Sequence, residues 1–218
     1  MNPAFLKGSA ALAAASGSAT AGAYFAGAFN GEDKSFRNYL KTIKRDEAST
    51  SEDWAKLKEL YSSDSNADRI PNITKENLTS NIKPLSDWCE SKLKSNYNDA
   101  EKNLVESWCS KSVKISERLS YFGLSSLNTA TTGGTTNADD STWDTKSSKY
   151  GADTTSDATL KIHEINNGSS APKTLGNELG STATKEQLKK WCDWAKDQAY
   201  QHEESVLFKR YKHWCTKK

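Results

Sequence analysis

The chain has 218 residues, a formal net charge of +2 and a hydrophobic content of 35%, against the ~45–50% of an ordinary globular protein. The balanced charge argues against a nucleic-acid partner, because only the C-terminal stretch FKRYKHWCTKK is basic and a solvated helix face explains that stretch better. With so little apolar surface to bury, the folded chain should depend on crosslinks or aromatic anchors.

The first feature along the chain is an uncharged stretch, residues 8–29, which follows Lys7 and precedes the charged residues 32–34. Its length matches the ~20 residues of a membrane-spanning helix, although it consists mostly of Ala, Gly, Ser and Thr. We expect residues 1–30 to form a signal-anchor or transmembrane helix, with Lys7 on the inner side. A cleaved signal peptide is the second interpretation, since two segments have the small-x-small form of a cleavage site: Ala21-Gly22-Ala23 and Ala26-Gly27-Ala28. A soluble alanine-rich helix is the third.

Residues 31–124 are predicted to form a first helical unit. Within SEDWAKLKELYSS the large apolar residues fall on one helix face: Trp54, Leu57, Leu60 and Tyr61. Ser51 is a suitable N-cap for that helix. Pro84 suits the first turn of a later helix, and the segment NYNDA has the composition of a turn between two more.

The cysteines show a repeated pattern, because each one directly follows a tryptophan: Trp88-Cys89, Trp108-Cys109, Trp191-Cys192 and Trp214-Cys215. An apolar or aromatic residue stands three positions before each tryptophan: Leu85, Val105, Leu188 and Tyr211. The first two pairs and the last two pairs have similar separations, which indicates one unit used twice. Residues 161–218 are therefore predicted to form a second helical unit. The expected fold class is mainly α, an N-terminal membrane helix followed by two disulfide-stapled helical hairpins.

Geometry limits how the cysteines can pair, although four cysteines allow three connectivities. In one unbroken helix Cys89 and Cys109 would lie ~30 Å apart, whereas a disulfide needs Cα atoms within ~7 Å. A turn at the midpoint of each unit brings the thiols level, so we predict the bonds Cys89–Cys109 and Cys192–Cys215. Each would close a loop of about 20 residues and contribute roughly 3 kcal/mol. The neighbouring tryptophans would cover the disulfides and supply most of the buried area.

Residues 125–160 differ from both units, because they are rich in Ser, Thr, Gly, Asn and Asp. Such a composition buries too little apolar surface to fold alone, so we predict an exposed polar loop or linker. Trp143 is a candidate anchor at which this loop touches the body of the protein.

No motif predicts a catalytic, cofactor or metal site. His163, His202 and His213 are isolated, and the His163-Glu164 pair lacks the rest of a zinc-protease helix. The chain has no Gly-rich phosphate loop and no nucleophile elbow. The cysteines lack the spacing of a zinc site, and none is marked as a nucleophile. Four reduced cysteines, buried as small apolar groups, are the alternative to disulfides. We expect neither enzymatic activity nor a cofactor.

Three segments together resemble a large paralogous family of uncharacterised proteins from hemotropic mycoplasmas, wall-less bacteria that attach to red blood cells. They are the opening LKGSAALAAASGSATAGAYFAGAF, the mid-chain SWCSKSVKISERLSYFGLSSL and the terminal YKHWCTKK. The resemblance covers most of the chain and is specific at WCSKSVKISERL and at the last segment. This chain departs from the pattern in carrying tryptophan before its first and third cysteines as well. The resemblance implies membrane association, surface display and no known catalytic activity.

The leading hypothesis is a membrane-anchored surface antigen with the bulk of the chain outside the cell, which interacts with a host or evades its immune response. Its partners would be the membrane, through residues 1–30, and a host cell surface or antibodies. The alternative is an extracellular binding module for a host ligand, which predicts a pocket lined by tryptophans outside the core, such as Trp143 or Trp194. An extracytoplasmic enzyme predicts titratable groups converging around His163. The oligomeric state is not predicted.

Overall fold

The computed structural model describes four ranges of the chain, residues 33–63, 68–130, 137–166 and 173–218. The predicted membrane or signal segment, residues 1–30, lies outside them. Within these ranges no helix combines the length and the apolar content that a membrane crossing requires. Residues Ser35–Lys218 form one compact unit. The described chain is mainly helical and carries two disulfides, which confirms the mainly α fold class.

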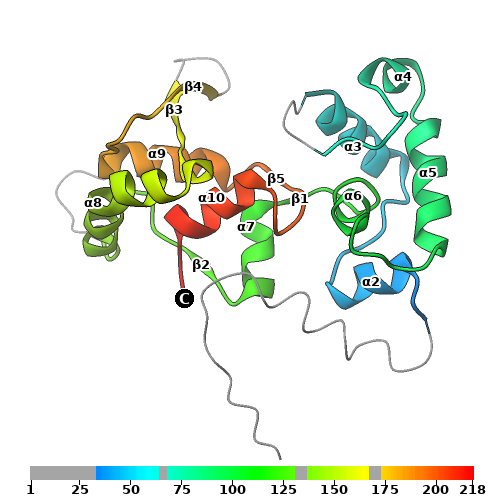
Figure 1. Cartoon of the computed structure of the whole chain (residues 1–218), viewed down its shortest axis with the longest axis horizontal. Coiled ribbons are helices and arrows are strands. Elements are labelled where there is room, and N and C mark those ends of the chain that lie inside the picture. Colours follow the sequence, from blue (N-terminus) through cyan, green and yellow to red (C-terminus); the bar gives the residue numbers. More distant parts are fainter. Residues whose placement is uncertain (1–32, 64–67, 131–136, 167–172) are drawn as a thin grey trace, which may run out of the picture. The chain divides into compact units, whose positions relative to one another are not determined.

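The first part of the unit is a cluster of helices (Figure 1): α2 (Phe36–Thr42), α3 (Ser51–Ser63), α4 (Lys75–Ser80), α5 (Lys83–Lys94) and α6 (Lys102–Trp108). The predicted face of α3 is buried at Leu57 and Tyr61. Its N-cap is Thr50 and not the predicted Ser51, because the Thr50 hydroxyl accepts from the Asp53 amide at 3.2 Å. Helix α5 has Pro84 in its first turn, as predicted, since the ring is tolerated where no intrahelical amide partner is needed.

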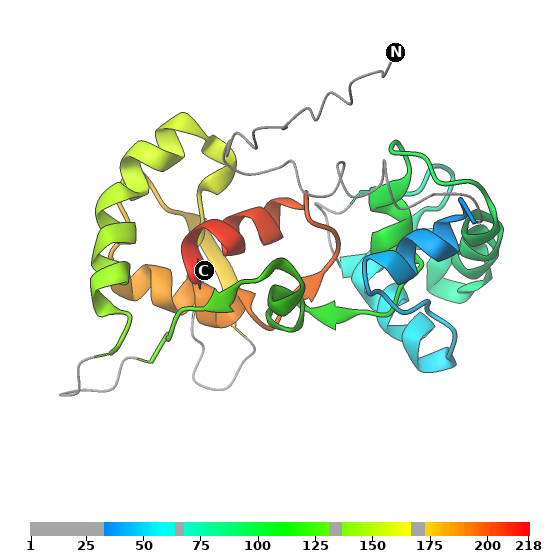
Figure 2. The ribbon, with the colours of Figure 1, turned by 90° about the horizontal axis from the view of Figure 1, so that it is seen from below.

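The second part of the unit combines short ribbons with longer helices. Its elements in chain order are β1 (Val113–Lys114), α7 (Ile115–Arg118), η1 (Leu119–Phe122), β2 (Ser125–Ser126), α8 (Asp140–Ser156), η2 (Ala158–Leu160), β3 (His163–Asn166), β4 (Thr174–Glu178), α9 (Lys185–Ala195), β5 (Ala199–Tyr200), α10 (Val206–Cys215) and β6 (Thr216–Lys217). Helix α9 packs against both α8 and α10 (Figure 2).

Three antiparallel two-stranded ribbons fix the path of the second part. Two of them join distant segments, since β1 pairs with β5 and β2 pairs with β6. Strands β3 and β4 form a local ribbon. The pairing draws the segment from Val113 to Leu127 into the core of the second part, where Ile115 and Leu119 are buried with Trp191 and Trp214. The residues around the predicted unit boundary at residue 124 therefore pack with the second part on both sides of that boundary.

The prediction of an exposed loop over residues 125–160 is wrong for the segment that forms helix α8. Three of its side chains are buried, Trp143, Tyr150 and Thr154, and their spacing of seven and four residues places them on one helix face. The Trp143 indole N–H donates to the Asn128 carbonyl at 2.9 Å. Trp143 is also buried in the same core cluster as Trp191 and Trp214, which confirms its predicted role as an anchor on the body of the protein. A few buried aromatic contacts hold a helix whose composition otherwise resembles a linker.

Helix α8 also approaches the segment before α9 very closely. A Cβ atom at Gly151 would lie 2.5 Å from the Ser181 carbonyl oxygen, closer than side-chain carbons are found to backbone oxygens. The Ser147 hydroxyl donates to the Ala183 carbonyl at 2.6 Å on the same side. Glycine at position 151 is therefore required by backbone packing.

Candidate functional site

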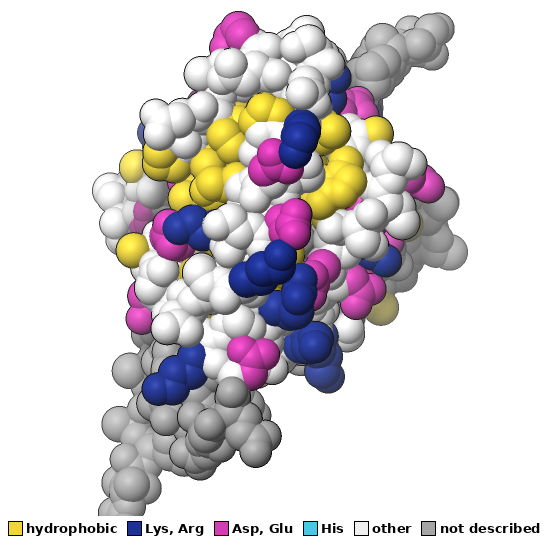
Figure 3. All heavy atoms as spheres, turned by 90° about the vertical axis from the view of Figure 1, so that its right-hand side faces the viewer, with side chains coloured by type: hydrophobic (Ala, Val, Ile, Leu, Met, Phe, Trp, Pro, Cys, Tyr) yellow, Lys and Arg dark blue, Asp and Glu magenta, His cyan; other side chains and the backbone are white. Residues whose placement is uncertain are grey.

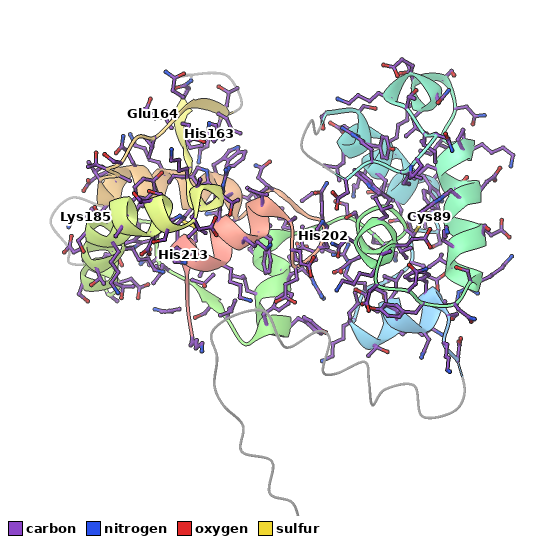
Figure 4. The ribbon with its side chains drawn as sticks, viewed as in Figure 1. Cys89, His163, Glu164, Lys185, His202 and His213 are labelled. Carbon is purple, nitrogen blue, oxygen red and sulfur yellow. A yellow bond between two sulfur atoms is a disulfide. The ribbon has the colours of Figure 1, made fainter. Side chains whose placement is uncertain are left out.

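All four cysteines are in disulfides, with the predicted connectivity. Cys89–Cys109 joins α5 to the end of α6, and Cys192–Cys215 joins α9 to α10, with Cα separations of 5.2 Å and 5.5 Å. Figure 4 labels Cys89 within the first helical cluster. Because every thiol is consumed in a crosslink, the cysteines serve as structure and supply neither a nucleophile nor a metal ligand in this state.

The tryptophans beside the cysteines differ in burial. Trp108, Trp191 and Trp214 are buried, and the indole N–H of Trp108 donates to the Asp68 carbonyl at 2.7 Å. Trp88 is only half-buried, so a smaller fraction of its side chain is removed from solvent than in the other three tryptophans. Figure 3, which views the right-hand side of Figure 1, shows hydrophobic side chains at the surface in that direction.

The three histidines occupy separate places, as Figure 4 shows. His163 Nδ1 lies 3.1 Å from the Gly176 carbonyl oxygen, and His213 Nε2 lies 2.8 Å from an Asp153 carboxylate oxygen. His202 Nε2 lies 3.2 Å from an Asp68 carboxylate oxygen. Over the described ranges, no group of three or more His, Cys, Asp or Glu side chains is arranged to hold a metal ion.

A buried polar cluster connects the two parts of the unit. We define the Glu106 cluster as Tyr39, Arg45, Glu106, Ser110, Arg118 and Tyr200. The Tyr39 hydroxyl donates to Glu106 Oε2 at 3.2 Å. Arg45 Nη2 donates to the Ser110 hydroxyl and to the Glu106 carbonyl, and its guanidinium lies 5.1 Å from the centre of the Tyr200 ring. Residues from α2, α6, α7 and β5 therefore share one polar interior.

Arg118 is the member of this cluster that comes from the SERL end of the segment WCSKSVKISERL. Its guanidinium donates to the Ile43 carbonyl at 3.0 Å and to the Lys44 carbonyl at 3.2 Å. The same group lies over the rings of Tyr121 and Tyr200, at 4.3 Å and 5.2 Å from their centres. Arg118 thus holds the backbone after α2 with hydrogen bonds and packs its plane on aromatic faces, a combination that lysine cannot reproduce.

Burial dominates the titration of the Glu106 cluster. It raises the pKa of the Glu106 carboxyl, although the charges of Arg45 and Arg118 act in the opposite direction. Burial likewise raises the pKa of the Tyr200 hydroxyl and lowers the pKa of the Arg45 guanidinium. The cluster is enclosed and every member packs on another. It therefore acts as an internal lock, which means that its polar contacts hold α2, α6, α7 and β5 together.

A surface hollow of about 1180 Å³ is the second arrangement with functional interest. Its apolar lining comes mainly from four elements, α3, β4, α9 and α10: Leu60, Leu175, Trp191, Trp194, Val206 and Leu207. Its polar lining includes Asp68, His163, His202, Glu204 and Arg210. His163, His202 and Trp194, which the sequence singled out separately, thus all contribute to the lining of one hollow.

Trp143 and His213 are not among the residues that line the hollow. Trp143 is fully buried in the core under α8, and His213 pairs with Asp153 away from the hollow lining. Leu175 and Val206 line the hollow and had no signal in the sequence. Leu175 is a single apolar residue in a polar context, and Val206 is the first residue of an apolar run that continues with Leu207 and Phe208. The hollow is lined both by Trp194, which the binding-module hypothesis names, and by His163, which the enzyme hypothesis names.

The molecule was also compared with known proteins. No protein-family model, no curated protein and no solved structure matches the chain.

Proposed function

We propose that this chain is a membrane-anchored protein displayed outside the cytoplasm, a surface antigen that takes part in host interaction or immune evasion. The observation that carries the extracytoplasmic part is the pairing of all four cysteines in two disulfides. Disulfides persist in oxidising compartments and are rare where thiol reductants are abundant. Residues 1–30 would supply the anchor.

The segment that carries the resemblance to the mycoplasma family builds the frame. In WCSKSVKISERL, Cys109 is crosslinked, Ile115 and Leu119 are buried, and Arg118 belongs to the Glu106 cluster. A family that kept such residues could vary its exposed side chains while retaining one fold. This supports a set of related surface proteins and assigns no chemistry to the segment.

Two measurements on native membranes test this proposal. Non-reducing mass mapping should recover the bonds Cys89–Cys109 and Cys192–Cys215, and protease added to intact cells should cleave the chain within residues 33–218. Four free thiols, or complete protection until the cells are lysed, would place the chain on the reduced side of the membrane and contradict the proposal.

The second candidate function is an extracellular binding module, and the hollow is the observation that favours it. A cavity that combines an indole, aliphatic side chains and several polar groups is the usual form of a small-ligand site. Ligand binding by the oxidised full-length chain, lost on blocking the hollow, would support this function. Binding that persists with the hollow blocked would place the ligand elsewhere.

A further inference from the structure

The lining of the hollow is specific enough to indicate a class of ligand. We propose that the hollow binds a short, neutral oligosaccharide, with a sugar ring stacked on Trp194. This inference deepens the binding-module candidate and rests on it. At about 1180 Å³, the hollow exceeds the ~300–1,000 Å³ of ordinary small-molecule pockets, so a short chain of sugar rings fits it better than a single ring.

Trp194 provides the stacking surface. Its side chain is half-buried and lines the hollow, and its ring centre lies 6.3 Å from that of the buried Trp191. The Gln198 side-chain amide donates to the Trp194 carbonyl at 3.2 Å, which fixes the end of α9. A pyranose ring presents one face of C–H groups, and an aromatic face attracts such groups because its π-system is electron-rich. An indole held in this way is suited to that contact.

Exposed aliphatic side chains stand beside the indole. Leu175 is 48% exposed and Val206 is 44% exposed, and both line the hollow. In the described part of the chain the one other exposed large hydrophobic side chain is Tyr121, at 39%. Water contact with these groups is unfavourable, and a ligand that covers them removes it. The C–H faces of sugar rings and the methyl of an N-acetyl group match such a surface.

The charges in the lining are balanced. Asp68 and Glu204 carry negative charge, and Lys209 and Arg210 carry positive charge. Asp68 contacts His202, Glu204 accepts from the Asn103 side-chain amide at 3.2 Å, and Arg210 Nε donates to the Thr159 carbonyl at 2.7 Å. No sign of charge is in excess, so the hollow is not built to select an anion such as a phosphate or a cation. A neutral ligand follows.

The lining of the hollow also carries amide and imidazole side chains that can form hydrogen bonds with a sugar. Asn103, Gln198, Gln201 and His202 line the hollow and can both donate and accept hydrogen bonds, which is what a hydroxyl-rich ligand requires. His202 is buried, and its Nδ1 has no hydrogen-bond partner among the described residues. Burial lowers the pKa of this imidazole, although the Asp68 carboxylate acts against the shift. A neutral His202 with one free ring nitrogen would pair with a sugar hydroxyl.

The test is a titration of the oxidised full-length chain with three neutral trisaccharides, chitotriose, cellotriose and maltotriose, followed by calorimetry and tryptophan fluorescence. We expect saturable binding of at least one of them. Trp194→Ala should weaken it at least tenfold, equivalent to ~1.4 kcal/mol. Trp88→Ala is the matched control, because Trp88 is also half-buried but does not line the hollow, and it should leave the affinity unchanged.

A second variant guards against loss of folding in Trp194→Ala. Val206→Trp adds bulk at an exposed position of the lining, so the chain should keep its melting temperature and lose trisaccharide binding. Failure of all three sugars, or equal binding by Trp194→Ala and wild type, would overturn the inference. Binding of inorganic phosphate or a pentapeptide that Val206→Trp abolishes, without sugar binding, would also overturn it while leaving the binding-module function in place. Disulfide mapping tests the surface location independently.

Discussion

The two crosslinked helix pairs share a Trp-Cys pattern and differ in what surrounds it. The Cys89–Cys109 pair is packed by α2 and α4, which are helices of the same cluster. The Cys192–Cys215 pair is packed by α8, by η2 and by the β3–β4 ribbon, and its helices line the hollow. The repeated residues therefore form the crosslinked helix pairs, and the residues that are not repeated, such as Trp194, determine the surface that each pair presents.

The two crosslinked helix pairs also differ in the environment of one carboxylate each. Glu106, at the end of the first pair, is enclosed, and burial raises its pKa. Asp193, in the second pair, accepts hydrogen bonds from Lys173 at 2.5 Å and Lys196 at 2.6 Å, and these bonds lower its pKa to about 2. The first pair therefore uses a carboxylate in its interior, whereas the second uses one at its surface.

Removal of each disulfide should give the largest effect and compares the two pairs directly. We expect Cys89→Ala/Cys109→Ala and Cys192→Ala/Cys215→Ala each to lower the free energy of unfolding by about 3 kcal/mol, because each releases a loop of similar length. Thermal melts followed by circular dichroism measure this. The second double variant should alter the hollow more than the first, because both of its helices line the hollow, whereas the first pair contributes only Asn103 to the described lining. Equal loss of ligand binding in both variants would show that the pairs do not have separate roles.

Arg118→Met should break the connection between the two parts. The change removes the hydrogen bonds to the Ile43 and Lys44 carbonyls, so we expect a loss of roughly 2–3 kcal/mol, measured by urea denaturation. Lys114→Met is the control in the same segment, since the Lys114 side chain forms an exposed ion pair with Asp197, and this variant should leave the free energy of unfolding nearly unchanged. Similar losses for both would contradict the assignment of Arg118 to the lock.

Gly151→Ala tests the close approach of α8 in the second part. The new Cβ would lie 2.5 Å from the Ser181 carbonyl oxygen, and we expect overpacking to cost about 1–3 kcal/mol. Gly180→Ala is the control, because nothing lies within 4 Å of a Cβ at that position. Thermal melts of the two variants should separate clearly. A neutral Gly151→Ala would mean that α8 moves away without cost.

The smallest expected effects are opposite pH dependences. The pKa of Asp193 is lowered from 3.8 to about 2, so its ion pairs stabilise the fold above pH 3.8 and this stabilisation is lost as the pH falls toward 2. The pKa of Glu106 is raised above 4.5, so its contribution is greatest below pH 4.5 and is lost as the pH rises. Asp193→Asn should flatten the acid side by about 1 kcal/mol, allowing for solvent screening.

Glu106→Gln should instead remove the fall in stability above pH 4.5, since the amide does not titrate. Urea denaturation across a pH series measures both variants. If Asp193→Asn and Glu106→Gln changed the slope of unfolding free energy against pH in the same direction, the contrast between an enclosed and an exposed carboxylate would be contradicted.

The sequence was sufficient for the features that depend on local periodicity. The Trp-Cys spacing predicted both disulfides, and the apolar face of α3 was correct at Leu57 and Tyr61. Helix α8 was missed because only Trp143, Tyr150 and Thr154 of its 17 residues are buried, too few for a visible period among Ser and Thr. Tertiary contacts, such as the bond from Trp143 to Asn128, supply what local propensity does not.

The hollow and the Glu106 cluster depend on contacts that no local pattern contains. Trp194 was a candidate, but its neighbours in the lining, Leu175 and Val206, come from separate elements. Glu106 and Arg118 look like ordinary surface charges in a helical sequence. They are buried because β1 pairs with β5 and brings Tyr200 against them. A strand of two residues is too short to give a periodic pattern, so neither composition nor periodicity indicates its long-range pairing.

The connectivity of the two disulfides has a consequence for biogenesis. Each cysteine is bonded to its nearest cysteine neighbour along the chain, and the two loops do not interleave. A polypeptide crossing a membrane from its N-terminus exposes Cys89 and Cys109 before Cys192 and Cys215, and N-terminal segments fold first. Oxidising thiols in their order of emergence therefore gives the native pairing directly. Under the proposed extracytoplasmic location, oxidation in this order reaches the native pairing without passing through a wrong disulfide.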